Sequence, residues 1–239
     1  MALSDFTGPD YIDAWTEDLD RRWPERAAMA GCVVRTLVEW RGEWREQERH
    51  QAKSPGSDHH ATIRLLELGI GAGGLAHAVV DGLADGPGMK PPGTILYTGI
   101  EIEPTLVLHV DGLLEESGYQ DARIIQADLK GDAWTRGLGP FDAIFTLQTL
   151  HDLGGVGALE AIYRQAHELL APGGILVNAD FVVPFEKDDP ERPRRLPVET
   201  HEYLLSSLGL VDFRCGLQRG KMACVSARRG EVDHQVLDN

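Results

Sequence analysis

The sequence is poor in cysteine, in basic residues and in long apolar runs. Its three cysteines, Cys32, Cys215 and Cys224, lie too far apart in the chain for a disulfide scaffold or a zinc cage. Lys and Arg number 23 against 38 Asp and Glu, and the formal net charge of −15 opposes binding to nucleic acid or to an anionic membrane surface. No apolar run reaches the roughly 18 residues that a membrane-spanning helix needs. These features exclude secreted mini-domains and membrane proteins, and they disfavour nucleic-acid partners.

What is present suits one globular core. Hydrophobic residues make up 42% and charged residues 26% of the 239 positions. The first ten residues, MALSDFTGPD, lack the basic and apolar regions of a secretion signal, so we expect a cytoplasmic protein. We expect no metal site, because the cysteines are scattered and the adjacent His59 and His60 lie in a polar segment typical of solvated side chains.

The first 57 residues differ from those that follow. An apolar stripe at helical spacing runs through Met29, Val33, Leu37, Trp40 and Trp44, with Arg and Glu on the opposite face. This pattern predicts an amphipathic helix that packs on a larger body. We interpret residues 1–57 as a helical extension that covers the site as a lid. Because the extension is rich in tryptophan, a homodimer is one possible assembly.

From residue 62 onward, short apolar segments alternate with amphipathic ones. Predicted strands cover 62–70, 93–102, 122–129, 141–150, 173–183, 211–217 and 221–229, and predicted helices cover 73–85, 104–117, 159–171 and 198–209. This alternation predicts an α/β fold with a Rossmann-like, seven-stranded, mostly parallel sheet and helices on both faces. Only a short glycine-containing turn joins the last two strands, so the last strand should be antiparallel. The expected domains are the extension over 1–57, one α/β domain over 58–229 and a tail over 230–239.

A glycine-rich turn follows the first predicted strand. Gly69, Gly71 and Gly74 match the dinucleotide spacing G-x-G-x-x-G, and glycine there permits a positive φ and the close approach of a ligand. The turn alone is ambiguous, since a purely structural turn has the same composition. Glu67, just before it, would repel a pyrophosphate but suits a ligand that bears an ammonium or sulfonium group.

Two further strand ends favour a nucleoside ligand. Ligands of open α/β sheets bind at the carboxyl ends of the strands. Glu101 lies at the end of the second predicted strand, where its carboxylate can accept hydrogen bonds from a ribose diol. The third predicted strand ends at Asp128 and Leu129, which offer an acceptor for an exocyclic amino group beside an apolar wall. Together with the glycine turn, these residues predict a nucleoside site.

Five motifs in order make the sequence resemble the class I S-adenosylmethionine-dependent methyltransferases. They are ELGIGAG (67–73), GIEIEP (99–104), QADL (126–129), GPFDAIFTLQTLHDL (139–153) and LLAPGGILVNADF (169–181). The resemblance covers about residues 62–228 and implies S-adenosylmethionine as cofactor. It also implies cofactor contacts at the methionine and ribose end (Glu67, Gly69, Gly71), at the ribose (Glu101), at the adenine (Asp128, Leu129) and beside the methionine group (Leu147, Gln148). Ile102, next to Glu101, is a further expected cofactor contact.

The chemistry determines whether a base is needed. An acceptor with an accessible lone pair needs little help, whereas an alcohol or a carbon acid must lose a proton. His151, just after the fourth predicted strand, is the leading candidate base, although it can instead cap the next helix or pack on the cofactor. Asp180, at the end of the fifth strand, is the second candidate, and we interpret Asp152 as the N-cap of the following helix.

The proline-rich loop 184–197 carries Arg192, Arg194 and Arg195. Two interpretations stay open: a solvated loop with local ion pairs, or a lid whose arginines recognise a carboxylate or phosphate on the acceptor.

The leading functional hypothesis is methyl transfer to a small organic acceptor, on oxygen, nitrogen or carbon. One alternative is a methyltransferase that acts on RNA or protein, and the acidic composition disfavours RNA more than a basic protein. Another alternative is a protein that binds S-adenosylmethionine without methylating. A nicotinamide-dependent dehydrogenase is disfavoured by Glu67 and by the LLAPGG segment before the fifth strand.

Overall fold

The computed structural model describes residues 3–8, 10–51, 62–84, 95–119 and 121–231. Its seven strands are β1 (Ile63–Leu68), β2 (Ile95–Glu101), β3 (Arg123–Gln126), β4 (Phe141–Leu147), β5 (Leu170–Phe181), β6 (Leu210–Arg219) and β7 (Met222–Arg229). The helices are α1 (Tyr11–Arg22), α2 (Arg26–Gln51), α3 (Gly74–Ala84), α4 (Pro104–Glu116), α5 (Gly155–Leu169) and α6 (Val198–Ser207). Short 3-10 helices are η1 (Leu3–Asp5), η2 (Ala133–Thr135) and η3 (Leu150–Asp152).

All seven strands form one sheet in the order β3-β2-β1-β4-β5-β7-β6. The strands from β3 to β5 pair in parallel, whereas β7 is antiparallel to both of its neighbours. The predicted Rossmann-like sheet and its antiparallel last strand are therefore confirmed. The order reverses direction between β1 and β4, so the carboxyl ends of these two strands flank the point where ligands of such sheets bind.

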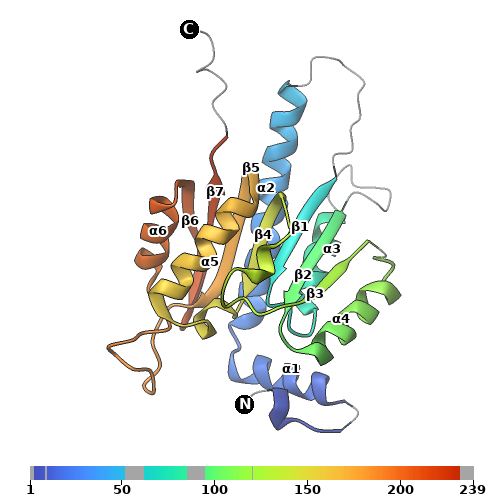
Figure 1. Ribbon diagram of the computed structural model, residues 1–239, viewed down its shortest axis with the longest axis vertical. Helices are drawn as coiled ribbons and strands as arrows, with labels where there is room; N and C mark the ends of the chain where they lie inside the picture. The colour runs from blue at the N-terminus through green and yellow to red at the C-terminus, as the bar shows by residue number, and fades with distance from the viewer. Residues whose placement is uncertain (1–2, 9, 52–61, 85–94, 120, 232–239) are drawn as a thin grey trace.

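Helices cover both faces of the sheet. Helices α2, α3 and α4 contribute to a core on one face, and α5 and α6 to a second core on the other. In Figure 1, α5 lies in front of the sheet, α2 lies behind it and α1 lies below the carboxyl ends of the strands. Within the described residues, no helix is long and apolar enough to cross a membrane.

The N-terminal extension has two parts with different positions. The predicted stripe lies on α2, where Met29, Val33, Leu37 and Trp40 are buried against the sheet. The indole of Trp40 donates a hydrogen bond to the carbonyl oxygen of Gly173 at 3.1 Å. Most of helix α2 is thus part of the core, whereas α1 lies over the strand ends. The expected boundary between 57 and 58, with His59 and His60, lies outside the described residues, as does 232–239 of the tail.

Three details of the predicted elements are wrong. The fourth strand ends at Leu147, because Gln148 adopts a left-handed backbone with φ of 55°. The fifth begins at Leu170, because the Pro-Gly-Gly segment lies within an irregular start of the strand that still pairs with Phe141. Asp152 is not the N-cap of α5: it ends η3, and Gly154, with φ of 124°, precedes the helix instead.

Candidate active site

A cavity of about 750 Å³ lies between the carboxyl ends of the strands and α1. Its floor consists of the turns after β1, β2, β3 and β4, and its roof of side chains from α1 and the start of α2. The predicted residues that line it are Glu67, Gly69, Gly71, Glu101, Ile102, Asp128, Leu129, Leu147, Gln148 and His151. The structure therefore brings these residues, distant in the sequence, to one cavity, and Asp180 lies directly behind His151.

The glycine turn opens the floor of the cavity. Gly69 and Gly71 have φ of 73° and 60°, a backbone conformation that residues other than glycine rarely adopt. A Cβ on Gly69 would lie 2.3 Å from Oγ1 of Thr149, so packing requires glycine there. For a Cβ on Gly71, the nearest atom would be in the Trp15 side chain, 3.8 Å away, so this position is not crowded. Glycine at 71 thus leaves room beside the backbone for a ligand.

Glu101 is fixed at the end of β2. Its Oε2 accepts a hydrogen bond from the amide of Gly71 at 2.9 Å, and its Oε1 accepts from the amides of Ile102 and Glu103 at 2.8 and 3.1 Å. A carboxylate has about four acceptor positions, so this arrangement leaves about one position, on Oε2, for a ligand hydroxyl. Next to it, the side chain of Ile102 is 53% exposed and offers an apolar surface at the cavity wall.

The turn after β3 forms the far rim. Oδ1 of Asp128 accepts a hydrogen bond from the amide of Lys130 at 2.8 Å, which orients an otherwise exposed carboxylate. Leu129 is buried beside it. An acceptor and an apolar side chain are thus adjacent at this rim, as an adenine requires.

Glu67 is a buried carboxyl group at the centre of the floor. It is 1% exposed, and the hydroxyl of Tyr97 donates a hydrogen bond to it at 2.7 Å. Burial raises the pKa of Glu67 to about 8, although Tyr97 and the charge of Arg26 oppose the increase. The group is mainly neutral at pH 7, and a cation placed beside it would favour its ionised form.

Arg26 joins α2 to the end of β4. Its Nε donates a hydrogen bond to Oε1 of Gln148 at 2.8 Å, and its Nη1 forms an ion pair with Asp20 at 3.2 Å. The left-handed backbone of Gln148 is costly for a residue that is not glycine, and such positions concentrate at functional sites. Sequence analysis missed Arg26, because nothing in a helix start indicates a contact with a strand end 122 residues away.

His151 and Asp180 form a pair on the cavity wall. Nδ1 of His151 lies 2.7 Å from Oδ1 of Asp180, and the amide of His151 donates to Oδ2 at 2.9 Å. Asp180 is 2% exposed and also accepts a hydrogen bond from the amide of Phe181. Burial lowers the pKa of His151, but the charge and hydrogen bond of Asp180 outweigh it, so the net shift is upward.

An aromatic cluster forms the remaining wall. Phe181 packs edge-on against His151 and Trp23, with ring centroids 5.0 and 4.7 Å apart, and Phe185 stacks on Trp23 at 5.1 Å. Two arginines of the loop between β5 and α6 have different surroundings. Arg195 lines the cavity, whereas Arg194 donates a hydrogen bond to the carbonyl oxygen of Asp152. Among the described residues, no group of three or more His, Cys, Asp or Glu side chains is arranged to hold a metal ion.

Residues 66–176 match a family profile described as a methyltransferase domain. That range extends from β1 into β5 and includes the glycine turn, Glu101, Asp128 and His151. The chain contains a class I S-adenosylmethionine-dependent methyltransferase domain. The predicted family, enzyme class and cofactor are thus confirmed, and S-adenosylmethionine is the cofactor of this methyltransferase domain.

Relatives of the methyltransferase domain are distant. Over 142 residues it is 32% identical to the highly reducing polyketide synthase stpks1 of Strobilurus tenacellus, which is 59% of this chain but only 5% of that protein. The CurJ carbon methyltransferase has a TM-score of 0.58 at 16% identity, covering 92% of this chain and 71% of that one. The [4+2]-cyclase SpnF has a TM-score of 0.54 at 19% identity, covering 72% and 76%. At these identities the two structures show a shared fold.

Proposed function

We propose that this domain methylates a small organic acceptor whose reacting atom must first lose a proton, with His151 as the general base. The observation that carries the proposal is the His151–Asp180 pair on the wall of the cavity that holds the glycine turn. Carbon and oxygen acids are the acceptors that require such a base. The similarity to the CurJ carbon methyltransferase and to a polyketide synthase is consistent with a carbon acid.

The cavity suits S-adenosylmethionine in volume and in the order of its polar groups. Ligand sites of about 300–1,000 Å³ are usual, so 750 Å³ accommodates the cofactor with a small acceptor. Glu101 would hold the ribose, Asp128 with Leu129 and Ile102 the adenine, and the space beside Gly71 the sugar. Glu67 and Arg26 offer opposite charges to the ammonium and carboxylate of the methionine group, next to Leu147 and Gln148.

The His151–Asp180 pair supports proton removal. The carboxylate of Asp180 holds the proton of His151 on Nδ1, which leaves the lone pair of Nε2 as the base. When bound, S-adenosylmethionine supplies an electrophilic methyl group on a sulfonium. Nε2 of His151 would take the acceptor's proton, and the electron pair so freed would be available to bond that methyl carbon, with the electrons of the C–S bond left on sulfur. The charge of Asp180 stabilises the imidazolium that forms.

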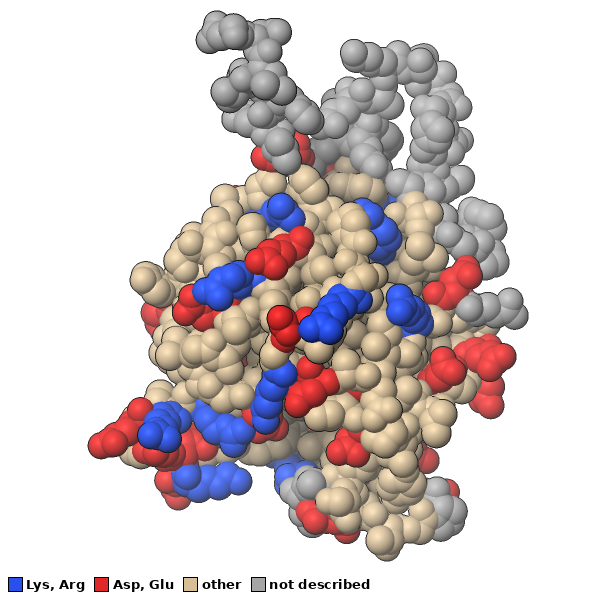
Figure 2. Space-filling model, in the orientation of Figure 1, with Lys and Arg blue, Asp and Glu red and all other residues tan. Residues whose placement is uncertain are grey.

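A small acceptor is favoured over a macromolecule. The roof of α1 and the aromatic cluster cover the side of the cavity where the acceptor would bind. On the face that Figure 2 shows, basic and acidic side chains are interspersed and form no continuous basic stripe of the kind that binds nucleic acid. The net charge of −15 adds to this argument.

The test begins with mass spectrometry of the purified protein for bound S-adenosyl compounds. An acceptor screen then measures release of S-adenosylhomocysteine from carbon, oxygen and nitrogen acceptors. With a responsive acceptor, His151→Ala should lower kcat by about 10²–10⁴ and leave cofactor affinity nearly unchanged. His77→Ala is the matched control, because His77 pairs with Asp81 at 3.0 Å on α3 and does not line the cavity.

Three results would contradict the proposal. If His151→Ala retains kcat, the acceptor needs no base from this chain. If cofactor binding is tight but no acceptor releases S-adenosylhomocysteine, a protein that does not methylate is favoured. Salt-dependent binding of RNA with methylation of it would favour a macromolecular acceptor.

A further inference from the structure

Acidic side chains predominate at one end of the cavity and basic side chains at the other. At the nucleoside end, Glu67, Glu101, Glu103 and Asp128 lie at the ends of β1 and β2 and on the turns after β2 and β3, with Arg26 and Lys130 among them. At the opposite end, Arg22, Lys187 and Arg195 line the wall formed by α1 and the loop between β5 and α6, and Asp152 is the acidic residue there. A cationic end is unexpected in a chain with a net charge of −15. It points to a ligand group of negative charge.

Arg195 is the buried member of this cationic end. It is 7% exposed, its Nη1 lies 2.6 Å from Oδ1 of Asp188, and its buried Nε has no hydrogen-bond partner among the described residues. Oδ2 of Asp188 accepts from the amide of Phe185, so both oxygens of that carboxylate are engaged. A buried N–H without a partner is costly, and a guanidinium can bind a carboxylate through two parallel hydrogen bonds.

Aromatic rings hold this guanidinium beside a flat apolar wall. The central carbon of the Arg195 guanidinium lies 3.9 Å from the ring centroid of Phe185. The ring of Trp23 stacks on Phe185 with an interplanar angle of 9°. Stacking restrains the guanidinium plane and leaves its edge for hydrogen bonds. The adjacent Phe181 ring adds an apolar surface that suits a flat ligand.

Phe181 also relates Arg195 to the proposed base. Its ring centroid lies 5.7 Å from the guanidinium carbon of Arg195 and 5.0 Å from the imidazole centroid of His151. One small planar molecule on Phe181 can therefore reach both groups. A charged group held by Arg195 would fix the position of the reacting atom against His151.

We infer that the acceptor is a planar organic acid, aromatic or conjugated, whose carboxylate binds Arg195 while its reacting atom faces His151. This inference rests on the proposed function and adds the acceptor's class to it. Asp188 acts as a positioning residue that holds the guanidinium. Lys187, which lines the same end, adds a second positive charge.

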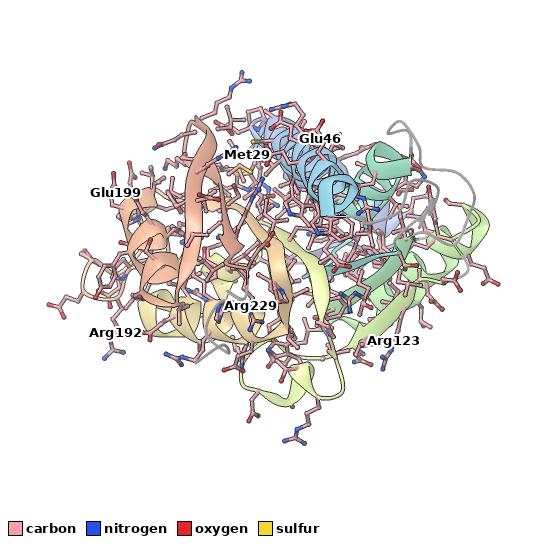
Figure 3. All side chains as sticks on the ribbon, turned by 90° about the horizontal axis from the view of Figure 1, so that it is seen from above. Met29, Glu46, Arg123, Arg192, Glu199 and Arg229 are labelled. Carbon is pink, nitrogen blue, oxygen red and sulfur yellow. The ribbon has the colours of Figure 1, made fainter. Side chains whose placement is uncertain are left out.

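The test uses protein saturated with S-adenosylhomocysteine, titrated with benzoate, cinnamate and 4-hydroxybenzoate and with the neutral methyl ester of each. Calorimetry should give Kd values about tenfold or more lower for the acids than for the esters. Arg195→Met should abolish this preference. Arg192→Met should retain it, because Arg192 lies on the same loop but points away from the body of the molecule (Figure 3) and does not line the cavity.

A second variant guards against loss of folding. Arg195→Lys keeps the charge beside Asp188 but not the paired donors, and it should weaken acid binding while leaving the melting temperature nearly unchanged. Equal affinity for acids and esters across the panel, or an acid preference that survives Arg195→Met, overturns the inference. If S-adenosylhomocysteine itself does not bind, the proposed function fails instead, and the two failures are distinguishable.

Discussion

Cofactor binding should release a proton from Glu67. In the ligand-free protein the buried carboxyl has a pKa of about 8, so most molecules carry the proton at pH 7. If the ammonium of the cofactor binds beside Glu67, it stabilises the carboxylate and lowers this pKa. Binding at pH 7 should then release a large part of one proton. Below pH 8 the affinity should fall about tenfold per pH unit, or about 1.4 kcal/mol, until the pKa of the bound state is reached.

Calorimetry in two buffers measures the proton directly. The observed enthalpy of S-adenosylmethionine binding is compared in phosphate and in Tris at pH 7, and its slope against the buffer's ionisation enthalpy gives the number of protons released. Glu67→Gln should remove the slope and weaken binding at pH 8, because an amide cannot ionise. Glu103→Gln is the control, since Glu103 lies at the exposed rim of the same cavity. Equal slopes in wild type and Glu67→Gln would refute the ion pair.

The raised pKa of Glu67 also makes the stability of the fold depend on pH. A carboxyl whose folded pKa lies above its unfolded value of about 4.5 stabilises the fold at low pH, and this contribution is lost as the pH rises through 8. The ligand-free protein should therefore become less stable between about pH 4.5 and 8, and Glu67→Gln should flatten that dependence in melting curves.

Three further outcomes are expected. Asp180→Asn should lower kcat. It should also shift the increase in rate with rising pH to lower pH, because Asp180 holds the pKa of His151 above its usual value. An unshifted pH–rate profile would contradict the pairing. Glu101→Ala should weaken cofactor binding about 10-fold or more in calorimetry, since it removes charged hydrogen bonds of about 1.5–3 kcal/mol, and unchanged affinity would remove Glu101 from the site. Gly69→Ala should reduce the melting temperature as well as cofactor binding, because its Cβ would overlap Thr149, and a full-affinity, fully stable variant would show that the turn relaxes.

The sheet and the floor of the cavity were predictable because they follow from local patterns. Strand and helix periodicity gave the sheet, and residues at successive strand ends had to meet at one edge, which is why Gly69, Glu101 and Asp128 were found together. The error at Asp152 has a local cause as well: an acidic residue before a helix resembles an N-cap, but Gly154 interrupts the chain first.

The roof of the cavity was not predictable in the same way. Arg26 reaches the cavity from the start of α2, Trp23 from the connection between α1 and α2, and Arg195 from the loop between β5 and α6. Their neighbours there belong to distant parts of the chain. Periodicity indicates which face of a helix is buried, not which strand end its first turn will contact. The position of α2 in the core was visible as the apolar stripe through Val33 and Leu37, but its depth, with both side chains fully buried, required the structure.

A crystal structure of the complex with S-adenosylhomocysteine tests the central claim most directly. We predict that the ribose hydroxyls lie within hydrogen-bond distance of Glu101, the adenine at Asp128 and Leu129, and the sulfur on the side of the cavity where His151 and Phe181 face Arg195. A complex with the nucleoside bound elsewhere, or with the sulfur directed away from His151, would contradict the account.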